Sequence, residues 1–159
     1  MLTHETHEFP ACFDSESEIL ILGSFPSVKS RKMGFYYGHP QNRFWKILGA
    51  IYQEEVPGDI EGRRAFVLRH HLALYDSLEA CEIHGSSNAS ITNVVPANLE
   101  QILANAPIKK ILLNGKTAAR YFEMYQKTKT EAVTLPSTSL ANASVSFERL
   151  LEQWRAALL

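Results

Sequence analysis

The stretch ILILGSFPSVKSRKMGFYYGHPQNRFWKILGAI, residues 19–51, decides the fold of this chain. It begins with an uninterrupted apolar run at 19–22, which ends at GSFPS. A polar loop then extends to residue 43. After the loop, apolar residues recur at 44, 47, 48 and 51, which is the spacing of one helical face. The stretch therefore predicts a buried strand, a long loop and an amphipathic helix. Because ligands in open α/β sheets sit beyond the carboxyl ends of the strands, we expect the functional site in this loop.

The charges of this stretch differ from those of the whole chain. Residues 19–53 hold five basic residues and no Asp or Glu, whereas the chain carries a net charge of −1. The cations are interleaved with aromatic residues, and the two sets are Lys29, Arg31, Lys32, Arg43 and Lys46, and Phe35, Tyr36, Tyr37 and Trp45. Cations neutralise phosphate and rings stack on bases, so the combination predicts a nucleic-acid groove. Each residue alone would fit a solvated loop packed on a core.

Further apolar runs predict strands at 72–76, 110–114 and 132–135. Helices are predicted at 62–70, after the capping residue Asn98, at 116–125 and at 147–158. This alternation predicts one domain over residues 1–159, with a three-layer α/β/α fold and a mainly parallel, four-stranded central sheet. Segment 78–83 stays ambiguous, and 92–96 fits either a short strand or an extended loop. Residues up to 18 read as a lead-in that Phe9, Cys12 and Phe13 attach to the core.

Composition excludes several classes of protein. The chain has 45% apolar and 21% charged residues, as globular domains do, and no apolar run approaches the length of a membrane span. Its first eight residues are polar and include acids, so we expect no secretory signal and a cytoplasmic location. Two cysteines without a CxxC pattern argue against a disulfide scaffold, a zinc site or an iron–sulfur cluster. The pair His4-x-x-His7 lies in the expected tail, so we predict no metal and no other cofactor.

Three motifs resemble those of the uracil-DNA glycosylase superfamily. GSFPS at 23–27, with YYGHPQNRFW at 36–45, is similar to its first motif region, and the HPxNRFW string is especially close to the mismatch-specific enzymes. LPSTS at 135–139 resembles the second motif, which forms a loop inserted into the minor groove. ILLNGK at 111–116 and the final helix also fit, so the resemblance covers nearly the whole chain. It implies a uracil-DNA glycosylase-like fold and a monomeric enzyme acting on double-stranded DNA that contains a deaminated base.

Departures from the family pattern indicate which branch is closest. Ser24 stands where mismatch-specific enzymes have Asn and other branches have Asp, and Leu135 stands where relatives have Asn or His. Three features are those of the hypoxanthine-DNA glycosylase branch: serine in the first motif, Asn42 in the HPxNRFW string, and LPSTS as the second motif. Two alternatives remain open: an enzyme that prefers uracil opposite guanine, and a DNA-binding member of the fold that has lost catalysis.

The resemblance, together with the residues themselves, predicts roles for thirteen residues. Asn42 would be the catalytic amide, and its alternative role is to cap the following helix. Ser24 would assist it, and a hydrolase triad of Ser24, His39 and Asp76 ranks low because the chain has no GxSxG elbow. The base-binding residues would be Gly23, Phe25, Tyr37 as a stacking platform, and His39. The DNA-binding residues would be Arg43, Lys116, Pro136, Ser137, Thr138, Ser139 and Leu140, with Leu140 as an apolar wedge.

Overall fold

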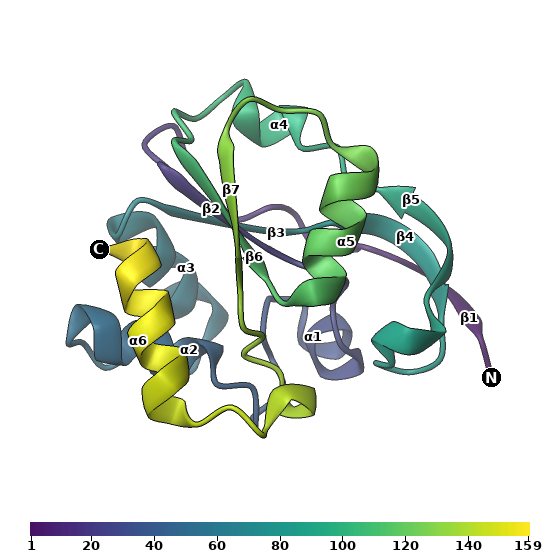
Figure 1. The fold of residues 1–159 in the computed structure, drawn as a ribbon, viewed down its shortest axis with the longest axis horizontal. Helices are drawn as coiled ribbons and strands as arrows, with labels where there is room; N and C mark the ends of the chain where they lie inside the picture. Colours follow the sequence, from purple (N-terminus) through teal and green to yellow (C-terminus); the bar gives the residue numbers. More distant parts are fainter.

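A computed structural model describes residues 1–159 and shows a four-stranded parallel sheet in the order β3-β2-β6-β7 (Figure 1). The strands are β2 (Ile19–Gly23), β3 (Leu72–Asp76), β6 (Lys110–Asn114) and β7 (Glu131–Leu135). The predicted central sheet is therefore confirmed, and each predicted strand is found to within one residue at either end. Its inner strands read as unbroken apolar runs because helices cover both faces of the sheet.

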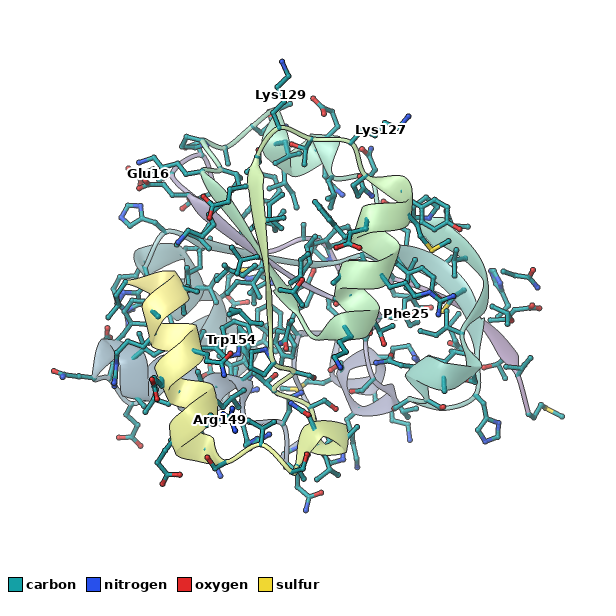
Figure 2. All side chains as sticks on the ribbon, in the orientation of Figure 1. Glu16, Phe25, Lys127, Lys129, Arg149 and Trp154 are labelled. Carbon is teal, nitrogen blue, oxygen red and sulfur yellow. The ribbon has the colours of Figure 1, made fainter.

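Helices form the two outer layers of the fold. On one side lie α2 (Phe44–Tyr52), α3 (Ile60–Arg69) and α6 (Phe147–Leu158), and on the other lie α5 (Lys116–Tyr125) and the short α4 (Glu100–Leu103) (Figure 1). Trp154 of α6 is completely buried on the side of the helix that faces the sheet (Figure 2). None of the helices is both long and apolar enough to cross a membrane.

A second, antiparallel sheet lies beside the first and was not predicted. It has the order β1-β4-β5, formed by β1 (Thr3–Thr6), β4 (Leu78–Ile83) and β5 (Thr92–Pro96). Both segments that the sequence left open are therefore strands. The lead-in is no tail, because Thr3 pairs with Ile83 and Thr6 with Ala80 along β4. The bridge between Cys12 and Leu74 then attaches the lead-in to the edge of the central sheet.

The long loop after β2 contains a helix, which corrects the prediction of an irregular segment over 28–43. This helix, α1 (Val28–Met33), starts at Ser27, whose side chain accepts a hydrogen bond from the Ser30 N–H, and ends at Gly34 in the left-handed conformation with φ 83°. Its six residues are too few and too polar to show an apolar stripe. The rest of the loop folds back on α1 through a 2.9 Å bond from the Gly38 N–H to Ser30 Oγ.

All four parallel strands end at the same edge of the sheet. Gly23 pairs with Asp76, and Asn114 with Leu135, so the last residues of the strands lie in one row. In Figure 1 this edge is the lower one, where α1 and the segment that follows β7 come together. The fold thereby gathers the loops that carry the motifs at one end of the molecule.

Both cysteines should be unreactive in the native protein. Cys12 and Cys81 are free and completely buried, and burial raises the pKa of each thiol to about 11. The thiolate is the reactive form, so at pH 7.5 both groups are protonated and shielded. We expect a thiol reagent to label neither residue in the folded protein and both in guanidinium chloride. Fast labelling without denaturant would contradict the packing of these two residues.

Candidate active site

A cavity of about 340 Å³ lies at the carboxyl ends of the four parallel strands. Its walls come from the loop after β2, from Asp76 and Asn114 at two strand ends, from the loop after β4, and from the segment after β7. It brings together most of the predicted site residues: Gly23, Ser24, Phe25, Tyr37, His39, Asn42, Ser137, Thr138, Ser139 and Leu140. Arg43, Lys116 and Pro136 lie outside its lining.

Asn42 lies at the turn that leads into α2. Its side-chain oxygen accepts a 2.9 Å hydrogen bond from the backbone N–H of Phe44, the first residue of the helix. The N-cap itself is Arg43, which makes no side-chain capping bond, so Asn42 supports the start of α2 from one residue earlier than the capping role that we gave as its alternative. Because the oxygen faces an N–H donor, the amide nitrogen is the atom left to face the cavity. Asn42 can therefore offer a fixed N–H donor to a ligand.

His39 lines the cavity with one of its two ring nitrogens already engaged. Its Nδ1 accepts a 3.1 Å hydrogen bond from the backbone N–H of Gln41. An accepting Nδ1 carries no proton, so the neutral ring holds its proton on Nε2. The free nitrogen of His39 is thus a donor, as a contact with a phosphate or a carbonyl oxygen requires.

Tyr37 has an uncommon backbone conformation and a hydroxyl without a partner. Its φ of 52° lies in the left-handed region, and its carbonyl accepts a 3.1 Å hydrogen bond from the Trp45 indole. Its ring stacks on Phe44 with centroids 3.9 Å apart, so only the other face of the ring is left for a ligand. The buried hydroxyl lies near the Asn114 side chain but makes no hydrogen bond of good geometry in the protein. Burial, and then the charge of Asp76, raise the pKa of Tyr37, so the group keeps its proton.

Ser24 is not part of a hydrolase triad. Its hydroxyl donates a 2.9 Å hydrogen bond to the side-chain oxygen of Asn88, in the loop after β4. Asp76, the third member of the conceivable triad, binds His7 and not His39. Ser24 therefore has no general base beside it, in agreement with the low rank of that interpretation.

The segment 136–142 is fastened to the sheet through Thr138, which is completely buried. The Asn114 amide donates to Thr138 Oγ1 at 3.1 Å and accepts from the Thr138 N–H at 3.0 Å. The Thr138 carbonyl accepts a further 3.0 Å hydrogen bond from the Arg43 N–H. Thr138 thus joins the second motif to the strand end at Asn114 and to the start of α2.

Two other side chains hold the same segment at its ends. The Trp154 indole donates to the Pro136 carbonyl at 3.0 Å, and the Arg43 guanidinium donates to the carbonyls of Asn142 at 3.0 Å and Val145 at 2.5 Å. Leu140, between these anchors, is 49% exposed. The segment therefore presents an apolar side chain on a tightly held backbone, and Arg43 acts through that backbone.

The free cations around the cavity are lysines. Arg31 donates to the carbonyls of Pro26 and Gly85, so it joins α1 to the loop after β4. Lys29, Lys32 and Lys46 are exposed, as is Lys116 at the start of α5, and none of them forms an ion pair. Lys127 and Lys129 lie at the upper edge of the molecule in Figure 2, away from Phe25 of the cavity.

Comparisons with known proteins agree with this geometry. The family model of the uracil DNA glycosylase superfamily matches residues 10–158. The chain belongs to the uracil DNA glycosylase superfamily. A hypoxanthine DNA glycosylase of Methanosarcina acetivorans is 33% identical over 150 residues, which are 93% of this chain and 94% of the relative. One of Methanosarcina barkeri is 33% identical over 136 residues, which are 84% and 86% of the two chains.

A solved structure supports the same assignment. The solution NMR structure of a candidate uracil DNA glycosylase from Methanosarcina acetivorans superposes with a TM-score of 0.81 at 32% identity, over 94% of both chains. The resemblance inferred from the motifs is thus confirmed, together with the uracil DNA glycosylase-like fold. The protein is a DNA glycosylase, a hydrolase of N-glycosyl bonds.

Sequence reasoning named Asp76 only in the low-ranked triad, and it assigned no role in the glycosylase site to Asn114, Asn88 or His7. Asp76 and Asn114 each end a parallel strand, and a polar residue at that position is the signal that points to both. Asn88 lies in a small-residue loop, and His7 reaches Asp76 from the first strand of the chain, so neither leaves a local signal. No group of three or more His, Cys, Asp or Glu side chains is placed to hold a metal ion.

Replacing Asn114 by alanine should loosen the segment 136–142. The change leaves the buried N–H and hydroxyl of Thr138 unpaired, which costs about 1–3 kcal/mol of unfolding free energy. We expect a lower melting temperature and faster amide exchange over 136–142. Asn105→Ala is the matched control, because the Asn105 amide bonds only to the Gln101 carbonyl on the surface. Equal stability of the two variants would show that Asn114 does not fasten the segment.

Proposed function

We propose that this DNA glycosylase removes deaminated bases, hypoxanthine first, from double-stranded DNA. The observation that carries the proposal is the Asn42 amide, which presents a free N–H at the cavity where the family's first motif lies. The two relatives that are 33% identical are named hypoxanthine DNA glycosylases, which supports this choice of base. The enzyme would act as a monomer, without a cofactor, on DNA in the cytoplasm.

The reaction would be hydrolysis of the bond between the base and C1′ of the sugar. The bond breaks towards an oxocarbenium-like sugar, the base leaves with the electron pair, and water supplies the hydroxyl at C1′ and, in the end, the proton that neutralises the departed base. Asn42 would donate its N–H to the departing base, where negative charge develops. Hypoxanthine can take up that charge on its ring carbonyl and N7, so a neutral amide could suffice.

The lesion would enter the cavity as a flipped nucleotide. Tyr37 would stack on the base with the ring face that Phe44 leaves free. Gly23, Ser24 and Phe25 would form the adjoining wall, and His39 would donate from Nε2 to a phosphate or a carbonyl. Ser24 would act by orienting Asn88 and not as a nucleophile, because its hydroxyl is already donated.

Leu140 would fill the space that the flipped nucleotide vacates. An apolar wedge needs a firm support to push bases apart, and Arg43, Asn114 and Trp154 supply it. Thr138 and Arg43 would therefore serve DNA binding through the backbone that they hold. Lys29, Lys32 and Lys116 are the exposed cations that we assign to phosphate contacts.

A single-turnover assay tests the proposal directly. Duplexes with one hypoxanthine, one uracil opposite guanine, or no lesion would be incubated with excess protein and then treated with alkali to cleave abasic sites. We expect cleavage at hypoxanthine and none in the undamaged duplex. Binding without cleavage of any duplex would reject the proposal and favour a member of the fold that only binds DNA.

Uracil opposite guanine is the second candidate substrate. It rests on the HPxNRFW string, which resembles the mismatch-specific enzymes, and on the likeness to the candidate uracil DNA glycosylase structure. Cleavage confined to the uracil duplex would support the proposed reaction and would show that uracil, not hypoxanthine, is the preferred base.

A further inference from the structure

The loop between β4 and β5, residues 84–90, forms part of the mouth of the cavity, and we call it the rim loop. Two of its side chains, Ser86 and Asn88, line the cavity. Both residues are exposed, so this wall belongs to the mouth and not to the floor. In Figure 1 the loop lies beside α1 at the lower right of the molecule. The roles given so far to the first and second motifs leave the rim loop without one.

Three hydrogen bonds fasten the rim loop to the first motif and to α1. The Ser24 hydroxyl donates to the side-chain oxygen of Asn88 at 2.9 Å. The first backbone N–H of α1 donates to Ser86 Oγ, also at 2.9 Å. The Arg31 guanidinium donates to the Gly85 carbonyl at 3.1 Å. The two cavity-lining side chains of the loop are therefore each held by a partner outside it.

The rim loop is also held from within. Ser90 Oγ accepts a 2.8 Å hydrogen bond from the His84 N–H and donates at 2.7 Å to the Ser87 carbonyl. The Ser87 N–H donates to the His84 carbonyl at 3.0 Å, and the Ser90 N–H donates to the Ser87 carbonyl at 3.1 Å. A loop held in this way is ordered before a ligand arrives, so binding costs it little conformational entropy.

The polar side-chain atoms that Ser86 and Asn88 leave free are donors. Because Asn88 Oδ1 accepts from Ser24, the amide nitrogen keeps both of its N–H groups. Because Ser86 Oγ accepts from the start of α1, the proton of the hydroxyl is free to donate. The rim loop contains no Asp or Glu, and the exposed Lys29 is the second residue of α1, next to the one that holds Ser86. This part of the mouth thus offers neutral donors and a cation.

A phosphate matches such a set better than a base does. The edge of a deaminated base mixes a carbonyl with an N–H, whereas the phosphate oxygens only accept and share a negative charge. The position of the donors agrees with this choice. A flipped nucleotide can enter the cavity only if the two phosphates that flank it stay at the mouth. Donors at the mouth therefore meet the backbone of the lesion strand.

We propose that Ser86 and Asn88 of the rim loop bind a phosphate that flanks the flipped nucleotide, with Lys29 as the cation beside them. This inference rests on the proposed entry of a flipped nucleotide, and it holds for hypoxanthine and uracil alike. Ser24 is then a positioning residue, because its hydroxyl turns the N–H groups of Asn88 towards the phosphate. The rim loop fixes the lesion strand while the segment that carries Leu140 enters the duplex.

Binding to a lesion that cannot be excised tests the contact with the phosphate. The duplex carries a hypoxanthine nucleotide with fluorine at C2′, because an electron-withdrawing group there destabilises the oxocarbenium-like sugar. Each of the two flanking phosphates is replaced in turn by a neutral methylphosphonate. The Kd of every duplex is measured for wild type and for each variant, so the two changes can be compared singly and together.

The losses in affinity should not add at the contacted phosphate. We expect Asn88→Ala and Ser86→Ala each to bind the natural backbone about 10-fold more weakly, and to lose nothing further when that phosphate is neutralised. Asn88→Asp keeps an acceptor for Ser24 but sets a negative charge against the phosphate, so neutralising the phosphate should restore part of its affinity. Ser87→Ala is the matched control, because Ser87 lies in the same loop but does not line the cavity.

Salt distinguishes the neutral donors from the cation. A neutral donor displaces no counterion from DNA, so Asn88→Ala should lower affinity without changing the slope of log Kd against log salt concentration. Lys29→Ala should reduce that slope by about 1. A reduced slope in Asn88→Ala would mean that the variant has shifted the lysines, and it would overturn the direct contact.

Excision of unmodified hypoxanthine by wild type, measured beside these affinities, decides the proposed function separately. Losses that add at both flanking phosphates, in Asn88→Ala and Asn88→Asp alike, overturn the inference and leave excision standing. Wild type that shows the coupling but excises no hypoxanthine overturns the proposed base and keeps the phosphate contact. Equal affinity of wild type for lesion and undamaged duplexes overturns both, because no nucleotide would then be flipped.

Discussion

Asn42→Ala and Asn42→Asp should both slow hypoxanthine excision by about 100- to 1000-fold, the usual effect of losing one donor to developing negative charge. The two variants differ in what they keep. Alanine loses the capping hydrogen bond to the Phe44 N–H as well as the donor, whereas an ionised aspartate can still accept that bond. Aspartate has no N–H for the base. Single-turnover rates on a hypoxanthine duplex, measured beside melting temperatures, separate the two functions of the side chain.

Stability should distinguish the two Asn42 variants, although activity does not. We expect Asn42→Ala to lose about 1 kcal/mol of unfolding free energy and Asn42→Asp to lose little, because a carboxylate is favourable at a helix start. Asn98→Ala is the control, since the Asn98 oxygen makes the same contact with the Glu100 N–H before α4, away from the cavity. Retained activity in Asn42→Asp would mean that Asn42 acts as an acceptor and orients water, contrary to our assignment.

The central sheet could be predicted because its strands follow a local rule. A strand buried on both faces reads as an unbroken apolar run, and β2, β3 and β6 do so. The second sheet follows no such rule. The β1 sequence is THET, with no apolar residue, and it is a strand only because β4 offers it partners 74 to 80 residues later.

The residues of the candidate site also fall into two groups, those that a local sequence pattern identifies and those that it does not. Asn42 and Tyr37 belong to a contiguous motif, so a resemblance to a family could identify them from the sequence alone. The pair of His7 and Asp76 is separated by 69 residues, and each is an ordinary residue in its own segment. His7 was assigned to a tail because nothing near it in sequence indicates burial. Contacts of this kind arise from the packing of one sheet beside another.

Gly23→Ala should strongly slow hypoxanthine excision, although Gly23 has no side chain that could contact the substrate. The added Cβ would lie 2.5 Å from Asp76 Oδ1, closer than such atoms approach in proteins. Asp76 cannot turn away without giving up its 2.7 Å contact with His7. A displacement of about 1 Å at a reacting centre typically costs about 100-fold in rate. We expect a loss of that size on hypoxanthine, measured under single-turnover conditions, with about 1–3 kcal/mol of destabilisation from overpacking.

Gly58→Ala is the matched control, because a Cβ at Gly58 meets nothing within 4 Å. It should retain wild-type rate and stability. If Gly23→Ala also kept the wild-type rate, Asp76 would have to be free to move, and the shape of the cavity floor would not matter to excision.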